Sequence, residues 1–465
     1  MSNLIDKSPV PGKARASNTQ SVQELFQQEK SPPPALFNDQ YQYLGSESIS
    51  TEVFTSKKYA QKEYEMMWSK VWQMACREDE LQGEGSHHLY EIGHHSFIIV
   101  RGEDMQLRAF YNSCLHRGRK LKTHSGCSKE LRCPFHGFTW RLDGELKNIP
   151  FDWDFCHLAD KEMSLPQVKV DTWAGFIFIN MDDNCKPLTD YLGQMTDHFT
   201  RWRLEECSKV VHVKKRINCN WKIALEAFME AYHSIATHPQ IMTFSGDANS
   251  QYDILGEHSN RAIHPMGVQS AYLPEDSISQ QQILDTLTTG SGRVTNDEKI
   301  LVPQNGNARE IIAQISRDNF SIENGHDYSN AADTEMLDAL VYNVFPNFAP
   351  WGGYAPNIVY RWLPDGNDPD SCFMEAMVLK RGIKGEAHSI PCPVHLLRDD
   401  EKWSDAEELG ALGPIFDQDM GNMPVVQQGM RAAKNKKIEL ANFQEIRLRH
   451  IHTILNRYMQ GWDDE

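Results

Sequence analysis

The sequence lacks several features that define common classes of protein. It has no apolar run long enough for a membrane span, and its N-terminal segment MSNLIDKSPVPGKARASNTQ lacks the apolar stretch of a secretory signal. Its ten cysteines include no C-x-x-C pair and no spacing typical of a disulfide framework. It contains no G-x-G-x-x-G fingerprint for a flavin or nicotinamide dinucleotide. These absences predict a cytoplasmic protein with free thiols and no nucleotide cofactor of its own.

The sequence also contains fewer basic than acidic residues. The 465 residues include 47 lysines and arginines against 64 aspartates and glutamates, which gives a formal net charge of −17. An acidic surface repels nucleic acid and anionic lipid, so neither is an expected partner. The length is sufficient for two or three domains with well-filled cores.

The chain changes character along its length. Residues 1–44 are rich in Ser, Pro, Gln and Lys, and we expect them to form a flexible leader. Apolar side chains recur at helical spacing over residues 56–72. Residues 85–111 contain three short apolar runs separated by glycines, which is typical of antiparallel strands. A second strand-rich stretch begins at Leu340, and the apolar positions over 441–459 predict a long C-terminal helix.

Two short segments combine cysteine with histidine. Cys114-Leu-His116-Arg-Gly is followed by Cys133-Pro-Phe-His136-Gly, with sixteen residues between His116 and Cys133. Two cysteines on one iron and two histidines on the other are the ligands of a Rieske [2Fe–2S] centre. The same four side chains could hold tetrahedral Zn²⁺, but zinc sites more often pair cysteine with cysteine and histidine with histidine. The mixed pairs therefore favour the cluster over zinc.

A third segment contains His233 and His238, with Glu230 three residues before the first histidine. On a regular helix, side chains five residues apart point about 140° away from one another. Both imidazoles reach one ion only if the chain leaves helical geometry between them, and Pro239 favours that departure at the preceding residue. The pattern predicts a helix over 221–232 whose last turn opens. Two imidazoles and one carboxylate on one face of a metal are the ligands of non-haem Fe(II) in oxygen chemistry.

The motifs C-x-H-R-G … C-P-x-H-G-x-x-W and N-W-K … E-x-x-x-E-x-Y-H-x₄-H-P resemble those of the terminal oxygenase (alpha) subunits of Rieske non-haem iron ring-hydroxylating oxygenases. The resemblance implies an α+β fold: a β-rich Rieske [2Fe–2S] domain beside a helix-grip catalytic domain, an antiparallel sheet around a long C-terminal helix. The expected divisions are a flexible leader at 1–44, a helical segment at 45–70 that packs on the catalytic domain, the Rieske domain at 71–181, and the mononuclear iron catalytic domain at 182–465 with an insertion at 240–335.

The resemblance also implies one Rieske cluster and one mononuclear non-haem Fe(II) per chain. The implied cluster ligands are Cys114, His116, Cys133 and His136. The implied iron ligands are His233, His238 and an aspartate from the C-terminal region. Family members place this aspartate after an acidic-Gln or Glu-Glu pair at the start of a helix, a position that Asp419 occupies here. Asp417 is the alternative, and without the resemblance a carboxylate here would be interpreted as a helix N-cap.

Glu230 is the implied catalytic carboxylate. In the head-to-tail trimers of similar proteins, a carboxylate bridges a cluster histidine of one subunit and an iron histidine of its neighbour. Many relatives have Asp at this position, and Glu is similar to the pattern in relatives that attack quaternary ammonium compounds. Glu226, one turn earlier, is either a second such carboxylate or an ordinary residue on the helix surface.

The expected function is that of a terminal oxygenase. It would use O₂ and electrons from NAD(P)H, delivered by a separate reductase with or without a ferredoxin, to hydroxylate or cis-dihydroxylate an aromatic or other apolar ring, as in aromatic hydrocarbon catabolism. The alternative is a monooxygenase for a quaternary ammonium or steroid-like substrate. A Rieske electron carrier without oxygenase activity is an alternative from another class, which the iron motif disfavours. The expected assembly is a homotrimer, with a beta subunit left open.

Residues 240–335 are the least informative part of the sequence. A long polar insertion beside a catalytic helix is either a wall of the substrate pocket or surface decoration, and the sequence favours neither. Its histidines have no paired ligand motif, so each is interpreted as a core or surface residue. They are His258, His264 and His326.

Overall fold

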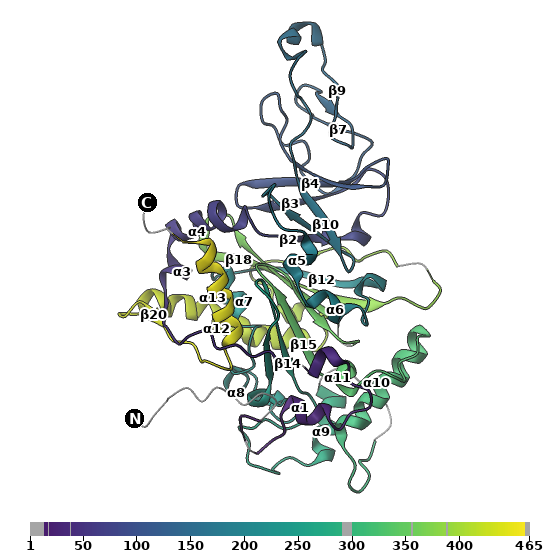
Figure 1. The fold of residues 1–465 in the computed structure, drawn as a ribbon, viewed down its shortest axis with the longest axis vertical. Helices are drawn as coiled ribbons and strands as arrows, with labels where there is room; N and C mark the ends of the chain where they lie inside the picture. Colours follow the sequence, from purple (N-terminus) through teal and green to yellow (C-terminus); the bar gives the residue numbers. More distant parts are fainter. Residues whose placement is uncertain are drawn as a thin grey trace.

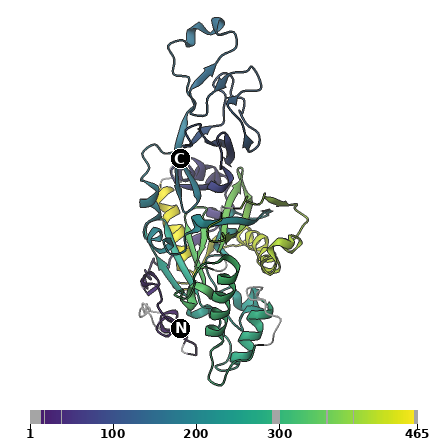
Figure 2. The same cartoon turned by 90° about the vertical axis from the view of Figure 1, so that its right-hand side faces the viewer.

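The computed structural model describes residues 14–16, 18–37, 39–290, 300–354, 357–386 and 389–460. It consists of a narrow β-rich projection on a wider body of sheet and helices (Figure 1, Figure 2). The projection carries the two cysteine–histidine loops, and the body carries the segment with His233 and His238.

A seven-stranded sheet forms the base of the projection, in the order β2-β11-β10-β5-β4-β3-β6. The three apolar runs predicted between residues 85 and 111 form its strands β3, β4 and β5. Three shorter strands, β7, β8 and β9, form a second sheet. The bounds are β2 Gln73–Arg77, β3 Ser86–Ile92, β4 His95–Arg101, β5 Leu107–Tyr111, β6 Gly126–Cys127, β7 Leu131–Arg132, β8 Thr139–Trp140, β9 Leu146–Asn148, β10 Gln167–Trp173 and β11 Phe176–Asn180.

An eight-stranded sheet forms the centre of the body, in the order β13-β14-β15-β16-β17-β18-β12-β19. Its pairs are antiparallel except that β12 and β19 run parallel. The turn at Gly366 between β17 and β18 follows the Pro-Asp-Gly signal in the sequence. The bounds are β12 Cys207–Ile217, β13 Gln251–Ile254, β14 Ser259–His264, β15 Ala339–Val344, β16 Ala349–Gly352, β17 Asn357–Asp365, β18 Asp368–Arg381 and β19 His395–Leu397.

Two long helices follow the sheet in the chain. The predicted C-terminal helix is α13, Ile446–Tyr458, which packs on β13 and β14. The longer helix α12, Leu412–Ala432, contacts α7. The remaining bounds are β1 Ile49–Ser50, α3 Glu52–Thr55, α4 Lys57–Glu63, α5 Leu188–Leu192, α6 Met195–Phe199, α7 Trp221–Glu226, α8 Ser234–Thr237, α9 Gln280–Gly290, α10 Ala308–Asn324, α11 Asp333–Leu337 and β20 Lys437–Ile438.

The expected flexible leader is wrong for the part of it that the structure describes. Two short helices, α1 (Val22–Phe26) and α2 (Pro34–Phe37), bury apolar side chains in the core of the body. Glu29 pairs with the buried Arg309 of the insertion at 2.5 Å and accepts a hydrogen bond from the Thr334 backbone. The polar composition predicted disorder, but apolar side chains in the core anchor this part of the leader, and Glu29 joins Asp338 in pairing with the buried Arg309 guanidinium. Residues 1–13 lie outside the described ranges.

One hydrophobic core continues from the base of the projection into the body. Phe176 on β11 packs edge to face on Phe348, with 4.8 Å between ring centroids. Beside it, Arg361 on β17 forms an ion pair with Glu375 on β18 and donates a hydrogen bond to the Ala75 carbonyl on β2. The projection is therefore fixed to the body by both apolar packing and a buried ion pair.

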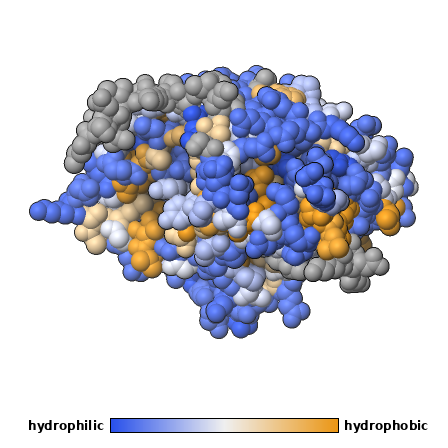
Figure 3. Space-filling view, turned by 90° about the horizontal axis from the view of Figure 1, so that it is seen from below, coloured by the Kyte–Doolittle hydropathy of each residue, from blue (hydrophilic) through white to orange (hydrophobic). Residues whose placement is uncertain are grey.

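The lower face of the body, opposite the projection, is mostly hydrophilic, with apolar side chains showing between hydrophilic ones (Figure 3). None of the helices within the described ranges is long and apolar enough to cross a membrane.

Three buried histidines are held neutral by the fold. Burial lowers the pKa of His258 and His450 to about 4 and the pKa of His264 to about 3. Each ring has a hydrogen-bond partner: the hydroxyls of Tyr458 and Ser250 bind His258 and His264, and Asn260 binds His450. Below the ordinary histidine pKa, these histidines are protonated in the unfolded chain but stay neutral in the folded chain. The free energy of unfolding therefore decreases as the pH falls.

We predict that the protein loses stability as the pH falls from about 6.5 toward 4, by about 1.4 kcal/mol per pH unit for each histidine. Above this window all three are neutral in both states and contribute no pH dependence. His258→Gln keeps a partner for Tyr458 and removes one titrating group. Thermal unfolding at pH 7.0 and 5.5 should show a smaller loss in this variant than in the wild type. An equal loss in both proteins would contradict the assignment.

Candidate functional site

The two cysteine–histidine loops have the same backbone geometry. In each loop a glycine N–H, four residues after the cysteine, donates to the cysteine carbonyl: Gly118 to Cys114 at 2.9 Å and Gly137 to Cys133 at 3.0 Å. Both glycines have positive φ, 73° and 82°, which side chains with a Cβ rarely adopt. The motifs C-x-H-x-G and C-P-x-H-G, which share a glycine four residues after the cysteine, therefore each specify a tight turn that presents a cysteine and a histidine together.

The four side chains of these loops converge. The thiols of Cys114 and Cys133 are buried, and burial together with the neighbouring Cys133 raises the pKa of Cys114. The rings of His116 and His136 lie 4.8 Å apart between centroids, with His116 half-buried and His136 exposed. Two buried thiols and two more exposed imidazoles fit a diiron cluster with cysteines on one iron and histidines on the other.

The helix that leads to the second site is shorter than predicted. Helix α7 starts at the Asn220 cap, whose side chain accepts the Lys222 N–H, and it ends at Glu226 rather than Tyr232. Beyond it, side chains from elsewhere in the fold take over the backbone groups: Arg447 donates to the Met229 carbonyl, and the Ala231 N–H donates to the Tyr252 hydroxyl. Since these bonds replace the helical ones, the chain opens before His233.

His233 and His238 flank one short helical turn, α8. His233 is its N-cap and His238 its C-cap, with φ −125° and ψ 54° at the latter. That departure from helical geometry occurs directly before Pro239, as the sequence predicted. The two rings consequently lie close together in an edge-to-face arrangement, with 5.1 Å between their centroids.

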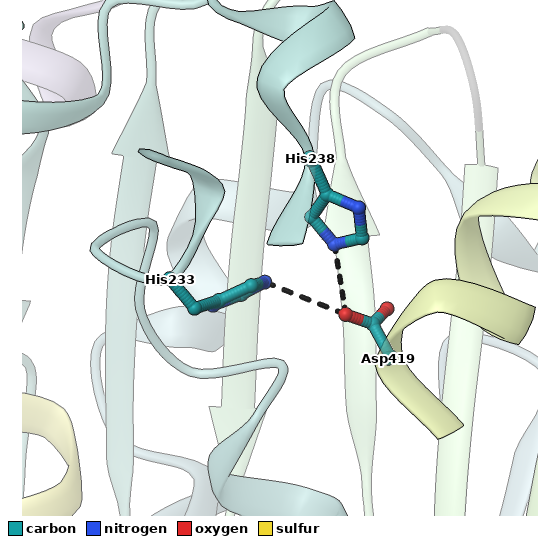
Figure 4. Close-up of side chains that lie close together, drawn as sticks. All are labelled: His233, His238 and Asp419. Atoms are coloured by element: carbon teal, nitrogen blue, oxygen red, sulfur yellow. Dashed lines mark hydrogen bonds and ion pairs between the residues drawn. The ribbon is translucent and has the colours of Figure 1, made fainter. Parts of the chain in front are cut away.

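Asp419 completes the group from helix α12. Asp419 Oδ1 lies 2.8 Å from His238 Nε2 and 3.6 Å from His233 Nε2 (Figure 4). The candidate ligand atoms of the three residues all lie within 4.8 Å of one another, and Asp419 and His238 are buried. Asp419 stands in the third turn of α12 rather than at its start, so the N-cap interpretation is wrong.

Both imidazoles are oriented by oxygen acceptors on the side away from Asp419. Glu230 Oε1 lies 2.7 Å from His233 Nδ1, and Gln418 Oε1 lies 2.7 Å from His238 Nδ1. An acceptor at Nδ1 fixes the proton there and leaves the Nε2 lone pair for a metal. Two neutral imidazoles and a carboxylate with this orientation fit a divalent iron. Gln418 was not identified from the sequence, where it served only to locate Asp419.

The environment of His233 also shifts its acidity. Burial lowers its pKa, but the hydrogen bond and charge of Glu230, together with the charge of Asp419, outweigh burial and raise the pKa overall. These two carboxylates therefore favour positive charge at this point, whether a proton or a metal supplies it.

Two carboxylates that the sequence left open lie elsewhere. Asp417 accepts the backbone N–H groups of Trp403 and Ser404 at 2.8 and 3.3 Å, so it braces the preceding loop. Glu226 lies 2.8 Å from His452 Nε2 on α13, and within the described ranges it is not hydrogen-bonded to His233 or His238. Within the described ranges, only Glu230 is hydrogen-bonded to His233 through its side chain.

A cavity of about 430 Å³ opens beside the three residues. Its walls are mostly apolar and include a group of aromatic rings: Phe228 lies 4.9 Å from Tyr360 and 5.9 Å from Phe416 between centroids. Neither lysine nor arginine is among the described residues that line it. The cavity therefore suits an apolar ligand held next to the histidines and Asp419.

The insertion at 240–335 supplies part of the cavity wall. Its lining residues are Gln240, Ile241, Phe244, Ser245, His264, Met266 and Thr286. Of the two interpretations left open by the sequence, these positions support a pocket wall. The sequence interpreted His264 as a core or surface residue, but it lines the cavity. No local motif indicated this position.

Comparison with known families agrees with this geometry. Residues 197–461 match the model of the ring hydroxylating alpha subunit (catalytic domain), and residues 71–155 match the Rieske [2Fe-2S] domain. The two matches place the cysteine–histidine loops in one domain and His233, His238 and Asp419 in the other.

Curated relatives match over a shorter part of the chain. The carnitine monooxygenase oxygenase subunit of Acinetobacter pittii is 32% identical over 194 residues, 40% of this chain and 51% of the relative. The benzene 1,2-dioxygenase subunit alpha of Pseudomonas putida is 28% identical over 242 residues, 50% of each chain. The chain thus spans about half the length of the curated relatives it matches.

Solved structures with the same fold cover most of the chain. A quaternary ammonium Rieske monooxygenase in complex with its substrate L-carnitine superposes with a TM-score of 0.62 at 18% identity, covering 89% of this chain and 96% of that chain. Naphthalene 1,2-dioxygenase with indole bound in the active site gives 0.61 at 17% identity, covering 90% and 94%.

These likenesses confirm the α+β fold predicted from the motifs. The catalytic-domain model alone spans more than half of the chain. The chain therefore belongs to the family of Rieske oxygenase alpha subunits, with a Rieske [2Fe–2S] domain followed by a catalytic domain that binds a mononuclear iron.

Proposed function

We propose that the protein is a terminal oxygenase component that hydroxylates or cis-dihydroxylates an apolar ring substrate with O₂ and electrons that originate in NAD(P)H. The observation that carries this proposal is the opening of a largely apolar cavity directly onto His233, His238 and Asp419. Substrate and metal ligands thus share one enclosed space. We further propose domain boundaries at 71–181 and 182–465, because β11 ends at Asn180 and still belongs to the sheet of the projection.

Each side chain of the site has a proposed role. His233, His238 and Asp419 hold the iron, and Cys114, His116, Cys133 and His136 hold the cluster. When bound, the iron supplies oxygen activation and the cluster supplies stored electrons. Glu230 holds the Nδ1 proton of His233, and Gln418 does the same for His238, so that both rings keep their orientation.

The proposed reaction requires a partner protein that delivers electrons to the cluster. The chain has no dinucleotide fingerprint, which supports a separate reductase, with or without a ferredoxin. His136 is exposed at the surface of the projection, where a partner can reach the cluster site. A homotrimer, in which Glu230 bridges toward the cluster of a neighbouring copy, follows from the family likeness and remains part of this proposal.

A quaternary ammonium substrate is the second candidate. The aromatic rings of the cavity and the carboxylates of Glu230 and Asp419 are features that stabilise an organic cation. Relatives named as carnitine and glycine betaine monooxygenases point the same way. A substrate carboxylate, however, would meet no basic side chain among the described lining residues.

His233→Ala tests the iron site. It removes one of the three proposed ligands, so total iron should fall from about three to about two per chain while the visible absorption of the cluster remains. Elemental analysis and absorption spectroscopy of anaerobically purified protein measure this. His258→Gln, a buried histidine outside the cavity, is the matched control and should keep all its iron. Loss of iron and cluster absorption together would contradict the separation into two sites.

Glu230→Gln should leave both metal sites loaded and slow turnover by about 10- to 100-fold, because an amide is a weaker acceptor for the His233 Nδ1 proton. Steady-state product formation with a reconstituted reductase measures it. Glu226→Gln alters a carboxylate that binds His452 instead, so its turnover should change far less. Product formation at the wild-type rate, with normal coupling to NADH, would remove Glu230 from the mechanism.

The substrate class is tested by oxygen uptake across a panel of arenes, steroids and quaternary amines, followed by mass spectrometry of products formed under ¹⁸O₂. We expect labelled product from ring compounds and little from carboxylated ammonium compounds, because the cavity lining is apolar and carries no basic side chain. Demethylated amine with ¹⁸O in the released formaldehyde, found for the amines alone, would replace the ring proposal with the second candidate.

A further inference from the structure

His264 occupies a position in the cavity that the metal sites do not explain. It is the last residue of β14, paired with Ala339 of β15, and it lines the same cavity as His233 and Asp419. Its side chain is buried in the fold, and its ring packs edge to face on Tyr252 with 5.9 Å between centroids. Packing and strand pairing therefore hold the imidazole in one place.

A hydroxyl binds the inner nitrogen of His264. Ser250 Oγ lies 2.8 Å from His264 Nδ1. A hydroxyl donates to an imidazole nitrogen that carries no proton and accepts from one that does. With Ser250 as the donor, His264 Nδ1 is an acceptor, and the proton of the neutral ring sits on Nε2.

The Nε2–H of His264 is free to act on a ligand. No residue in the described part of the chain hydrogen-bonds this nitrogen, and the ring lines the cavity. Burial, with the nearby Arg447 and His233, lowers the pKa of His264 to about 3, so the ring stays neutral near pH 7. Gln240 and Thr286 also line the cavity, but they donate to Gln418 and to the Gln282 carbonyl.

We propose that His264 is a specificity-determining residue that donates its Nε2–H to a neutral oxygen acceptor, a carbonyl or ether, on an apolar ring bound in the cavity. This inference rests on the proposed function, since it takes the cavity as the substrate site. The aromatic walls hold the ring, and the hydrogen bond fixes which edge faces His233 and Asp419. A neutral oxygen fits better than a carboxylate, because the lining contains two acidic residues and no basic one in its described part.

The test compares ring ketones with the matching hydrocarbons. The pairs are tetralone with tetralin, anthrone with dihydroanthracene, and androstanone with androstane, which span a range of ring sizes. Binding to the anaerobic holoenzyme is measured by quenching of tryptophan fluorescence. In at least one pair the ketone should bind about fivefold more tightly than the hydrocarbon, which is the effect of one neutral hydrogen bond.

Variants at His264 separate the hydrogen bond from packing. His264→Phe keeps a ring but removes the donor, so the ratio of the two dissociation constants should fall to about one. His264→Gln retains a donor near the position of Nε2 and should keep part of the preference. Ser250→Ala removes the proton that holds the tautomer and should weaken the preference without changing the ring. It also provides the test if His264→Phe fails to fold.

His258→Gln, which changes a buried histidine outside the cavity, is the control and should keep the full preference. Equal affinities within every pair, no binding of any probe, or a preference unchanged in His264→Phe and Ser250→Ala would overturn the proposal. The measurement requires no turnover. The protein could therefore prefer ketones through His264 and still give no ¹⁸O-labelled product from any compound. That result would contradict the proposed oxygenase function but support the donor role of His264.

Discussion

The departure from regular helix between Glu226 and His238 is the constraint on which the site depends. If regular helix ran from His233 through His238, the two side chains would diverge by about 140° and could not share an ion. The backbone geometry of His238 ends the short helix α8, and Arg447 and Tyr252 bind the Met229 carbonyl and the Ala231 N–H in the open segment before His233. Leaving a buried backbone group without a partner costs about 1–3 kcal/mol, so these contacts offset the loss of the helical bonds.

The same contacts connect the metal site to the cavity. Tyr252 accepts the Ala231 N–H in the segment before His233 and also packs edge to face on the ring of His264. The site is thus polar along one edge, where every histidine nitrogen that turns away from the centre has an oxygen or hydroxyl partner. The remaining walls are aromatic and aliphatic. The apolar walls exclude water that would compete with a bound substrate, and the hydrogen bonds along the polar edge fix the orientation of the histidine rings.

Local patterns predicted those parts of the fold whose conformation is decided locally. The glycines of the two cysteine–histidine loops require positive φ, and Pro239 disfavours helix at His238, so these turns could be placed in advance. The strands over residues 85–111 and the helix α13 followed from apolar periodicity. The leader was mispredicted because its polar composition gave no sign of the Glu29–Arg309 pair, whose two members are far apart in the chain.

By itself, then, the sequence determined the residue types and spacing at each proposed metal site, because the candidate ligands occur in pairs within short segments, two per segment. Only the tertiary structure decided how they meet. Asp419 and Gln418 arrive from helix α12, about 180 residues after His238, and His264 reaches the cavity from the end of a strand. Contacts between distant segments depend on packing and on satisfying buried polar groups, and no local pattern in a single sequence encodes them.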